Sequence, residues 1–147
     1  ISFLAANARP EKVAGIIAIA PAVDMTKRAL SNLTAEANRE LSETGVWMRP
    51  SKYDAQGYPI TKKLLDEGEL HLLLPGPIGF AGPVRILHGM KDDAVPWELS
   101  LEIAAALNSN DVHIKLVKDG DHRLSRPNDI QLLLSLVSSF LTNSKGF

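Results

Sequence analysis

The stretch VRILHGMKDDAVP, residues 84–96, decides the fold of this chain. Its first part, from Val84 to Gly89, is a short and largely apolar run that predicts a buried strand. A polar loop follows, and Pro96 marks the start of a helix, because the first helical position needs no backbone N–H. A strand, a loop and a helix in direct succession are typical of a layered α/β domain.

The same alternation continues on both sides of this stretch. Residues 13–20 are almost wholly apolar, which predicts a strand covered on both faces, as at the centre of a parallel sheet. Residues 112–117 alternate between apolar and polar side chains and predict a strand near a sheet edge. Residues 1–9 and 127–141 predict helices. For the last helix we expect an inward stripe of Ile130, Leu133, Leu134, Val137, Phe140 and Leu141.

The predicted order of elements is helix, strand, insertion, strand, helix, strand, helix. It predicts an α/β fold with a mostly parallel sheet and helices on both of its faces. Residues 24–80 are more polar and more broken than the rest. We therefore expect residues 1–23 and 81–147 to form the core and residues 24–80 to form an insertion. Within it, Thr34 is the predicted N-cap of a helix that ends at Gly45.

The composition excludes several classes of protein. The 147 residues include 16 basic and 17 acidic side chains, and without a basic stripe nucleic acid is not an expected partner. The chain has no cysteine, which excludes a disulfide scaffold, a thiolate zinc site and a cysteine nucleophile. No run of 18 apolar residues is present, so we expect no membrane span. The chain begins with Ile1, and we expect it to be a piece of a longer protein.

Titratable side chains follow two of the predicted strands. Asp92 and Asp93 come after residues 84–89, and His122 comes after residues 112–117. Sites in parallel sheets collect beyond the carboxyl ends of strands, so an acid and a histidine could meet there. The carboxylate would hold one ring nitrogen and leave the other free to take a proton from a nucleophile. The plainer interpretation is a turn-forming aspartate and a solvated histidine.

Several strings in this chain resemble the α/β-hydrolase family. HGMKDDAVP resembles the family's acid loop, GDHRLS its histidine loop, and RPEKV a segment that follows its nucleophile turn. The resemblance covers nearly the whole chain and implies the C-terminal part of such a hydrolase. It is closest to the branch of the mitochondrial acyl-protein thioesterase that also cleaves acyl-glucuronides, together with its bacterial relatives.

The resemblance implies a role for two of these residues. It places the catalytic acid on Asp92, with Asp93 as the second candidate, and the general base on His122. In this family the serine comes first in the chain, then the acid, then the histidine, and Asp92 precedes His122 as this order requires. The nucleophile motif G-x-S-x-G does not occur in the chain, and Ser2 is interpreted as structural. We expect the serine and both oxyanion donors to lie upstream of Ile1.

Residues 24–80 lie where the family commonly places a lid. Trp47 and Met48 are the foremost candidates to contact an acyl group, and Val95 in the acid loop is a third. Other apolar residues of the insertion, such as Ile78 and Phe80, are interpreted mainly as packing residues. No cofactor is expected. A metal site at His88, Asp92 and His122 is a weaker alternative, because no H-E-x-x-H spacing is present.

The resemblance therefore implies a serine hydrolase that cleaves an ester or thioester. Its substrate would be a small molecule or an acylated protein, and its partner the N-terminal part of the same hydrolase. The alternative is an inactive fragment, or one piece of a two-chain hydrolase, with a structural or binding role. The expected location is the cytoplasm for a bacterial protein, or the mitochondrial matrix if the branch resemblance extends to location.

Overall fold

The computed structural model describes residues 1–51, 54–74 and 76–143. The chain divides into two compact units. One consists of Ile1–Val23 and Leu73–Phe147 and contains the parallel sheet, and the other consists of Asp24–Leu72. Each unit is described by itself.

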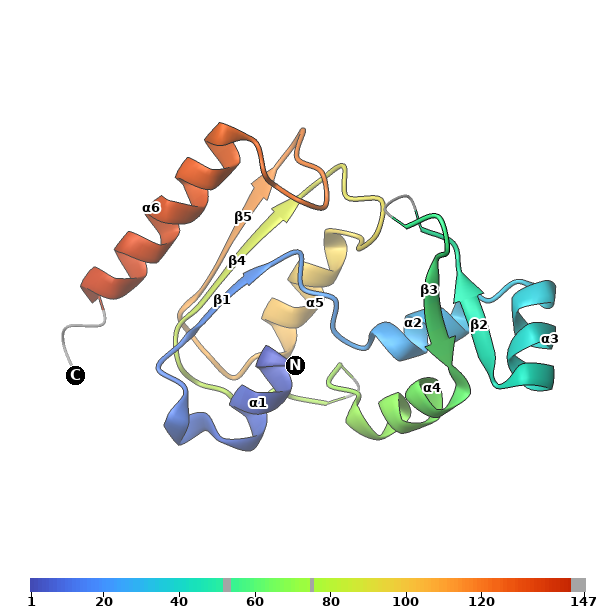
Figure 1. Ribbon diagram of the computed structural model, residues 1–147. Helices are drawn as coiled ribbons and strands as arrows, with labels where there is room; N and C mark the ends of the chain where they lie inside the picture. Colours follow the sequence, from blue (N-terminus) through green and yellow to red (C-terminus); the bar gives the residue numbers. More distant parts are fainter. Residues whose placement is uncertain (52–53, 75, 144–147) are drawn as a thin grey trace. The chain divides into compact units, whose positions relative to one another are not determined.

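The first unit is built on a three-stranded parallel sheet with the order β1–β4–β5 (Figure 1). The strands are β1 (Ile16–Ile19), β4 (Val84–Gly89) and β5 (Val112–Val117). All six residues of β4 are buried, because this strand pairs on both sides. β5 alternates between half-buried and exposed positions over most of its length, which confirms the predicted edge strand.

β1 occupies the middle of the apolar run of residues 13–20. The strand is shorter than the apolar run, and in the described sheet it lies at the edge opposite β5. Ile16 is buried, but Ile19 is 42% exposed. The central position belongs to β4, whose own sequence includes Arg85 and His88. The described residues contain no strand on the other side of β1, so its expected burial on both faces stays a prediction.

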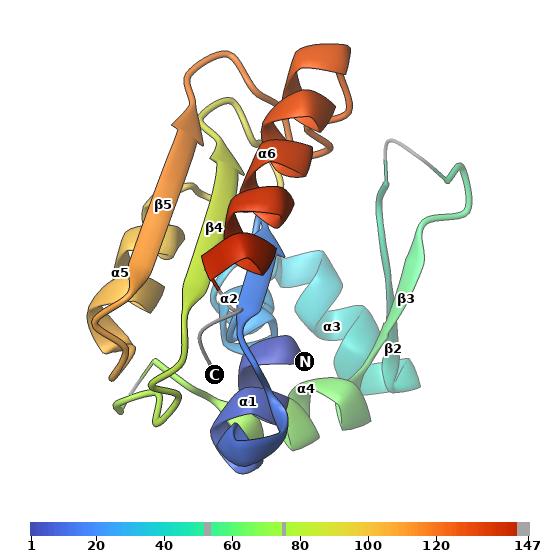
Figure 2. The same cartoon turned by 90° about the vertical axis from the view of Figure 1, so that its left-hand side faces the viewer.

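Helices cover both faces of this sheet, as predicted (Figures 1 and 2). On one face, α1 (Ser2–Ala8) and α5 (Glu98–Ala106) contribute to a core that also holds the buried residues of β1 and β4. α1 is followed by a short 3₁₀ helix, η1 (Pro10–Lys12). On the other face, α6 (Pro127–Asn143) packs through Leu136 against Leu87 and Leu124.

The inward face of α6 is rotated from the predicted stripe. Leu136, which the prediction left out, is 4% exposed, whereas Leu134 is 52% exposed. Ile130 and Leu141 are also exposed, at 45% and 59%. The helix carries apolar residues on more than one face, and its spacing fits two stripes equally well. Only the packing partners across the sheet decide between them.

The second unit contains three helices and a two-stranded antiparallel sheet. Its elements are α2 (Met25–Ser31), α3 (Ala35–Thr44), β2 (Val46–Arg49), β3 (Tyr58–Thr61), α4 (Lys62–Gly68) and η2 (Glu69–His71). The caps of α3 are as predicted: the Thr34 side chain accepts a bond from Ala37 N at 3.1 Å, and Gly45 adopts a left-handed conformation with φ 75°. The strand β3 was not predicted.

The unit boundary differs from the predicted insertion, which extended to residue 80. Residues 73–80 cluster with the sheet unit, and Ile78 and Phe80 are core residues with 0% and 1% exposure. The backbone of Ile78 bridges to the end of α5, donating to Ala106 O at 2.7 Å and accepting from Asn108 N at 3.0 Å. This pairing and the apolar burial attach the segment to the sheet unit. No described helix is both long enough and apolar enough to span a membrane.

Candidate active site

Two loops meet at the carboxyl ends of β4 and β5. The acid loop comprises residues 90–96, and the histidine loop comprises residues 118–126. Met90 N donates to Val117 O, and Lys91 N donates to Gly120 O, each at 2.8 Å. A Cβ on Gly89 would clash with the carbonyl oxygens of Gly120 and Asp121. A glycine at position 89 therefore allows the two loops to touch through their backbones.

Asp92 is enclosed at this junction, with a side chain that is 0% exposed. Its Oδ1 accepts bonds from Ala94 N at 2.8 Å and Val95 N at 2.9 Å. Its Oδ2 accepts a bond from Nδ1 of His122 at 2.8 Å. The local sequence makes this geometry, because an aspartate followed by a tight turn can bond to the backbone two and three residues ahead.

These contacts set the protonation state of Asp92. Burial raises the pKa of the carboxyl group, but the bonds from the Val95 N–H, from His122 and from the Ala94 N–H lower it by more. The net result is a pKa below the ordinary value, so the group is a carboxylate at neutral pH. A carboxylate only accepts hydrogen bonds, so Nδ1 of His122 must be the donor.

His122 is the accessible member of this pair. Its side chain is 36% exposed. With Nδ1 donating to Asp92, Nε2 of the neutral ring has a lone pair, and among the described residues no partner for it is found. The pair can therefore accept a proton at Nε2 and stabilise the resulting positive charge. Asp93, the second candidate acid, is exposed, and the bond of His122 Nδ1 is made with Asp92.

The histidine loop is held at both of its ends. Asp121 Oδ1 accepts bonds from Arg123 N and Leu124 N, next to a left-handed turn at Leu124 with φ 44°. Arg126 bonds to Asp119 at the start of the loop and to Asp129 in the first turn of α6. These bonds from Arg126 hold the pKa values of both aspartates below the ordinary value.

Two residues that contact the site were not assigned this role from the sequence. His88, which the sequence analysis named only as a ligand of an alternative metal site, is 0% exposed, and its Nε2 lies 3.3 Å from Oδ2 of Asp92. Its Nδ1 lies 2.6 Å from Oγ of Ser100 on α5. The four-residue spacing to Asp92 could have indicated His88, but nothing in the sequence singles out Ser100. In the described part of the chain, no group of three or more potential metal ligands is found.

The three predicted substrate contacts lie in different places. Val95 belongs to the sheet unit, where its side chain is a 7% exposed core residue and its backbone holds Asp92. Trp47 and Met48 lie on β2 of the second unit, opposite Ile60 and Pro59 of β3. Trp47 is half-buried and Met48 is 42% exposed. Trp47 and Met48 belong to the second unit, and their substrate role stays a prediction.

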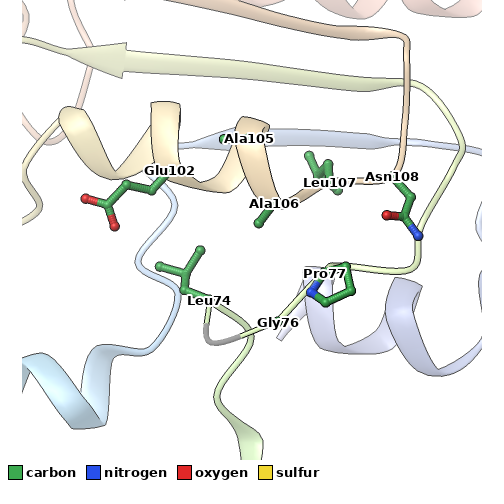
Figure 3. Close-up of a pocket in the computed structure, with 8 residues that line it drawn as sticks. All are labelled: Leu74, Gly76, Pro77, Glu102, Ala105, Ala106, Leu107 and Asn108. Atoms are coloured by element: carbon green, nitrogen blue, oxygen red, sulfur yellow. The ribbon is translucent and has the colours of Figure 1, made fainter.

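A separate groove of about 560 Å³ lies along the C-terminal half of α5 (Figure 3). It is lined by Leu74, Gly76, Pro77, Glu102, Ala105, Ala106, Leu107 and Asn108. The helix begins close to the acid loop and runs back toward the start of β5. The groove therefore lies toward the opposite end of the strands from Asp92 and His122, and it takes no part in this site.

Curated relatives resemble nearly all of this chain. The mitochondrial palmitoyl-protein thioesterase ABHD10 of Bos taurus is 42% identical over 142 residues, covering 96% of this chain and 46% of the relative. The human protein of the same name is 42% identical over 138 residues. The chain thus spans about half the length of the curated relatives it matches.

Solved structures and a family model also match nearly all of this chain. Alpha/beta hydrolase domain-containing protein 10 from mouse superposes with a TM-score of 0.84 at 41% identity, covering 97% of this chain and 57% of that one. A putative hydrolase from Agrobacterium vitis gives 0.83 at 35% identity, covering 88% and 50%. The model of the prolyl oligopeptidase family matches residues 1–146. With its parallel sheet and covering helices, the chain belongs to the prolyl oligopeptidase family and has the α/β-hydrolase fold.

Proposed function

We propose that this chain is the C-terminal part of a serine hydrolase that cleaves an ester or thioester. The observation that carries the proposal is the 2.8 Å bond between His122 Nδ1 and Asp92 Oδ2. It joins a fully enclosed, ionised carboxylate to a half-exposed ring whose Nε2 can accept a proton. In this proposal Asp92 is the acid, His122 is the general base, and the nucleophilic serine lies outside the 147 residues.

The proposed reaction runs in two acyl-transfer steps. His122 Nε2 takes the proton of the serine hydroxyl while the serine oxygen attacks the carbonyl carbon of the substrate. His122 then gives this proton to the departing alcohol or thiol, which leaves an acyl-serine. In the second step water replaces the serine in the same exchange, and the acid product and free serine result. Asp92 holds the ring and stabilises its charged form throughout.

The relatives suggest a class of substrate. Five curated relatives are named palmitoyl-protein thioesterases, and we propose a long-chain acyl thioester or ester as the substrate of the protein that contains this chain. We further propose that residues 24–72 serve as a lid and that Trp47 and Met48 contact the acyl group. The names of these relatives also place them in mitochondria, and we propose the mitochondrial matrix as one location for this protein, with the bacterial cytoplasm as the other.

The test is turnover by the hydrolase that carries these residues together with its nucleophile. With a p-nitrophenyl ester and a palmitoyl thioester as substrates, His122→Ala should lower kcat by at least about a thousandfold, because triad members act as a unit. His113→Ala is the matched control, since this histidine is exposed on β5, and it should leave kcat within about twofold. Turnover by His122→Ala near the unchanged rate would reject the proposal.

The alternative is an inactive fragment or one piece of a two-chain hydrolase. The 147-residue chain can be treated with a serine-directed fluorophosphonate, alone and after mixing with the preceding half of the hydrolase. We expect no labelling of the chain alone, and labelling of a serine on the other piece if the two halves form one site. Labelling of Ser2 or another serine of this chain would contradict the assignment of the nucleophile to another segment.

A further inference from the structure

We propose that His88, held by Ser100, is a positioning residue that fixes the carboxylate of Asp92 for its bond to His122. This inference rests on the proposed function for its catalytic consequence, but its geometry stands on contacts within the sheet unit. His88 lies at the end of β4, and Ser100 lies in the first half of α5. Both side chains are 0% exposed, so neither is available to bind substrate directly.

The carboxylate of Asp92 accepts three hydrogen bonds and lies against a second imidazole ring. Oδ1 receives two backbone N–H groups, and Oδ2 faces two imidazole rings, with His122 Nδ1 at 2.8 Å and His88 Nε2 at 3.3 Å. A carboxylate that is contacted on both of its oxygens cannot rotate about its Cβ–Cγ bond without losing contacts. Oδ2 is thereby kept in the position that His122 requires.

The protonation of the His88 ring follows from its neighbours. Nε2 lies 3.1 Å from the carbonyl oxygen of Val95, which can only accept, so Nε2 carries a hydrogen. In the neutral ring Nδ1 then accepts, and the Ser100 hydroxyl donates to it at 2.6 Å. The Nε2–H is directed at the Val95 carbonyl and lies against Oδ2 of Asp92. The ring therefore holds both the turn at residues 92–95 and the carboxylate.

A purely structural role would not need this chemistry. An apolar side chain at position 88 would fill the same buried space without requiring a hydroxyl on α5, and an unpaired buried ring nitrogen is costly. Here both nitrogens are used, one toward α5 and the other toward the acid loop. The pair Ser100–His88 thus ties the position of α5 to the orientation of Asp92, as outer hydrogen bonds orient the ligands of a metal site.

The first experiment tests how well the hydrogen bond between Asp92 and His122 is held, and it does not require catalytic turnover. In ¹⁵N-histidine-labelled protein, NMR measures how fast the Nδ1 proton of His122 exchanges with water. His88→Phe removes the ring N–H that bonds to the Val95 carbonyl and lies against Asp92, and it should speed this exchange by about tenfold or more. His88→Gln retains an N–H group and should restore most of the protection. Ser100→Ala should increase the exchange rate of the His122 Nδ1 proton by an intermediate amount. Ser109→Ala, a buried serine remote from the site, is the control.

The second experiment measures kinetics in the hydrolase that carries these residues. His88→Phe should lower kcat by about 10- to 100-fold with KM nearly unchanged, as expected for a misplaced catalytic group. The same substitution should have no further effect in an Asp92→Asn background, because His88 acts through Asp92. Equal losses in both backgrounds would contradict the proposal.

The two proposals fail in different ways. If His122→Ala leaves turnover unchanged, the proposed function is wrong, but the NMR result still tests the contact between His88 and Asp92. If His88→Phe does not fold, Ser100→Ala and His88→Gln decide the matter. Unchanged exchange of the His122 Nδ1 proton in Ser100→Ala, together with no protection in His88→Gln, would overturn the positioning role.

Discussion

At the scale of single residues, the site depends on one carboxylate whose environment keeps it charged. Asp92 is fully enclosed, yet its pKa lies below the ordinary value because backbone N–H groups and His122 favour the ionised form. Its neighbour Asp93 is exposed. The two adjacent aspartates therefore have different surroundings, and the hydrogen bond to the ring of His122 is made by Asp92.

Substitution of the two acids by asparagine tests this difference. In Asp92→Asn the amide can present its N–H₂ group to Nδ1 of His122, which favours the wrong tautomer, and kcat should fall by about 10³- to 10⁴-fold. Asp93→Asn should change kcat by less than about twofold. Ester turnover at saturating substrate measures both. The opposite ranking would mean that the acid is Asp93.

At the scale of secondary-structure elements, the two loops depend on a glycine where their backbones touch. In Gly89→Ala the added methyl group would meet the carbonyls of Gly120 and Asp121, which cannot move as freely as a side chain. We expect a loss of about 1–3 kcal/mol in the free energy of unfolding, measured by denaturant titration. Gly76→Ala is the control, because nothing lies within 4 Å of the added Cβ.

The orientation of α6 gives a second prediction at this scale. Leu136 is buried and Leu134 is 52% exposed, although the sequence predicted Leu134 in the inward stripe. Leu136→Ala should lower the free energy of unfolding by about 2–5 kcal/mol, because it leaves a cavity between the helix and the sheet. Leu134→Ala should change it by less than about 0.5 kcal/mol. Equal losses would place both residues in the core.

At the scale of the whole molecule, the acid side chains predict how stability depends on pH. The pKa values of Asp92, Asp111, Asp119 and Asp129 are lowered in the folded chain. Below the unfolded value of about 4 the unfolded chain binds more protons than the folded one. The free energy of unfolding should therefore be at its full value above pH 4 and fall as the pH drops through the lowered values.

Urea titrations at a series of pH values measure this dependence. Asp129→Asn should make the curve flatter below pH 4, because it removes a carboxylate that is 3% exposed and bonded to Arg126. Asp66→Asn is the control, since its pair with Lys62 is 61% exposed on both sides and screened by solvent. A free energy of unfolding that rises as the pH falls below 4 would contradict the lowered pKa values of these aspartates.

The sequence by itself determined the order of the helices and strands in the sheet unit, the caps of α3 and the loops that carry the site. Periodicity, prolines and glycines act locally, so they can be interpreted without knowledge of distant contacts. It also placed Asp92 and His122 after neighbouring strands, because the carboxyl ends of parallel strands share one edge of a sheet.

Only the tertiary structure decided which face of α6 is buried and where the second unit ends. These outcomes depend on packing partners far away in the chain, and a two-striped helix fits more than one of them. The contact of Ser100 with His88, and of His88 with Asp92, also depends on packing between distant parts of the chain. The local sequence around a serine on a helix does not indicate which histidine it will contact, because that contact forms only when the helix packs against the sheet.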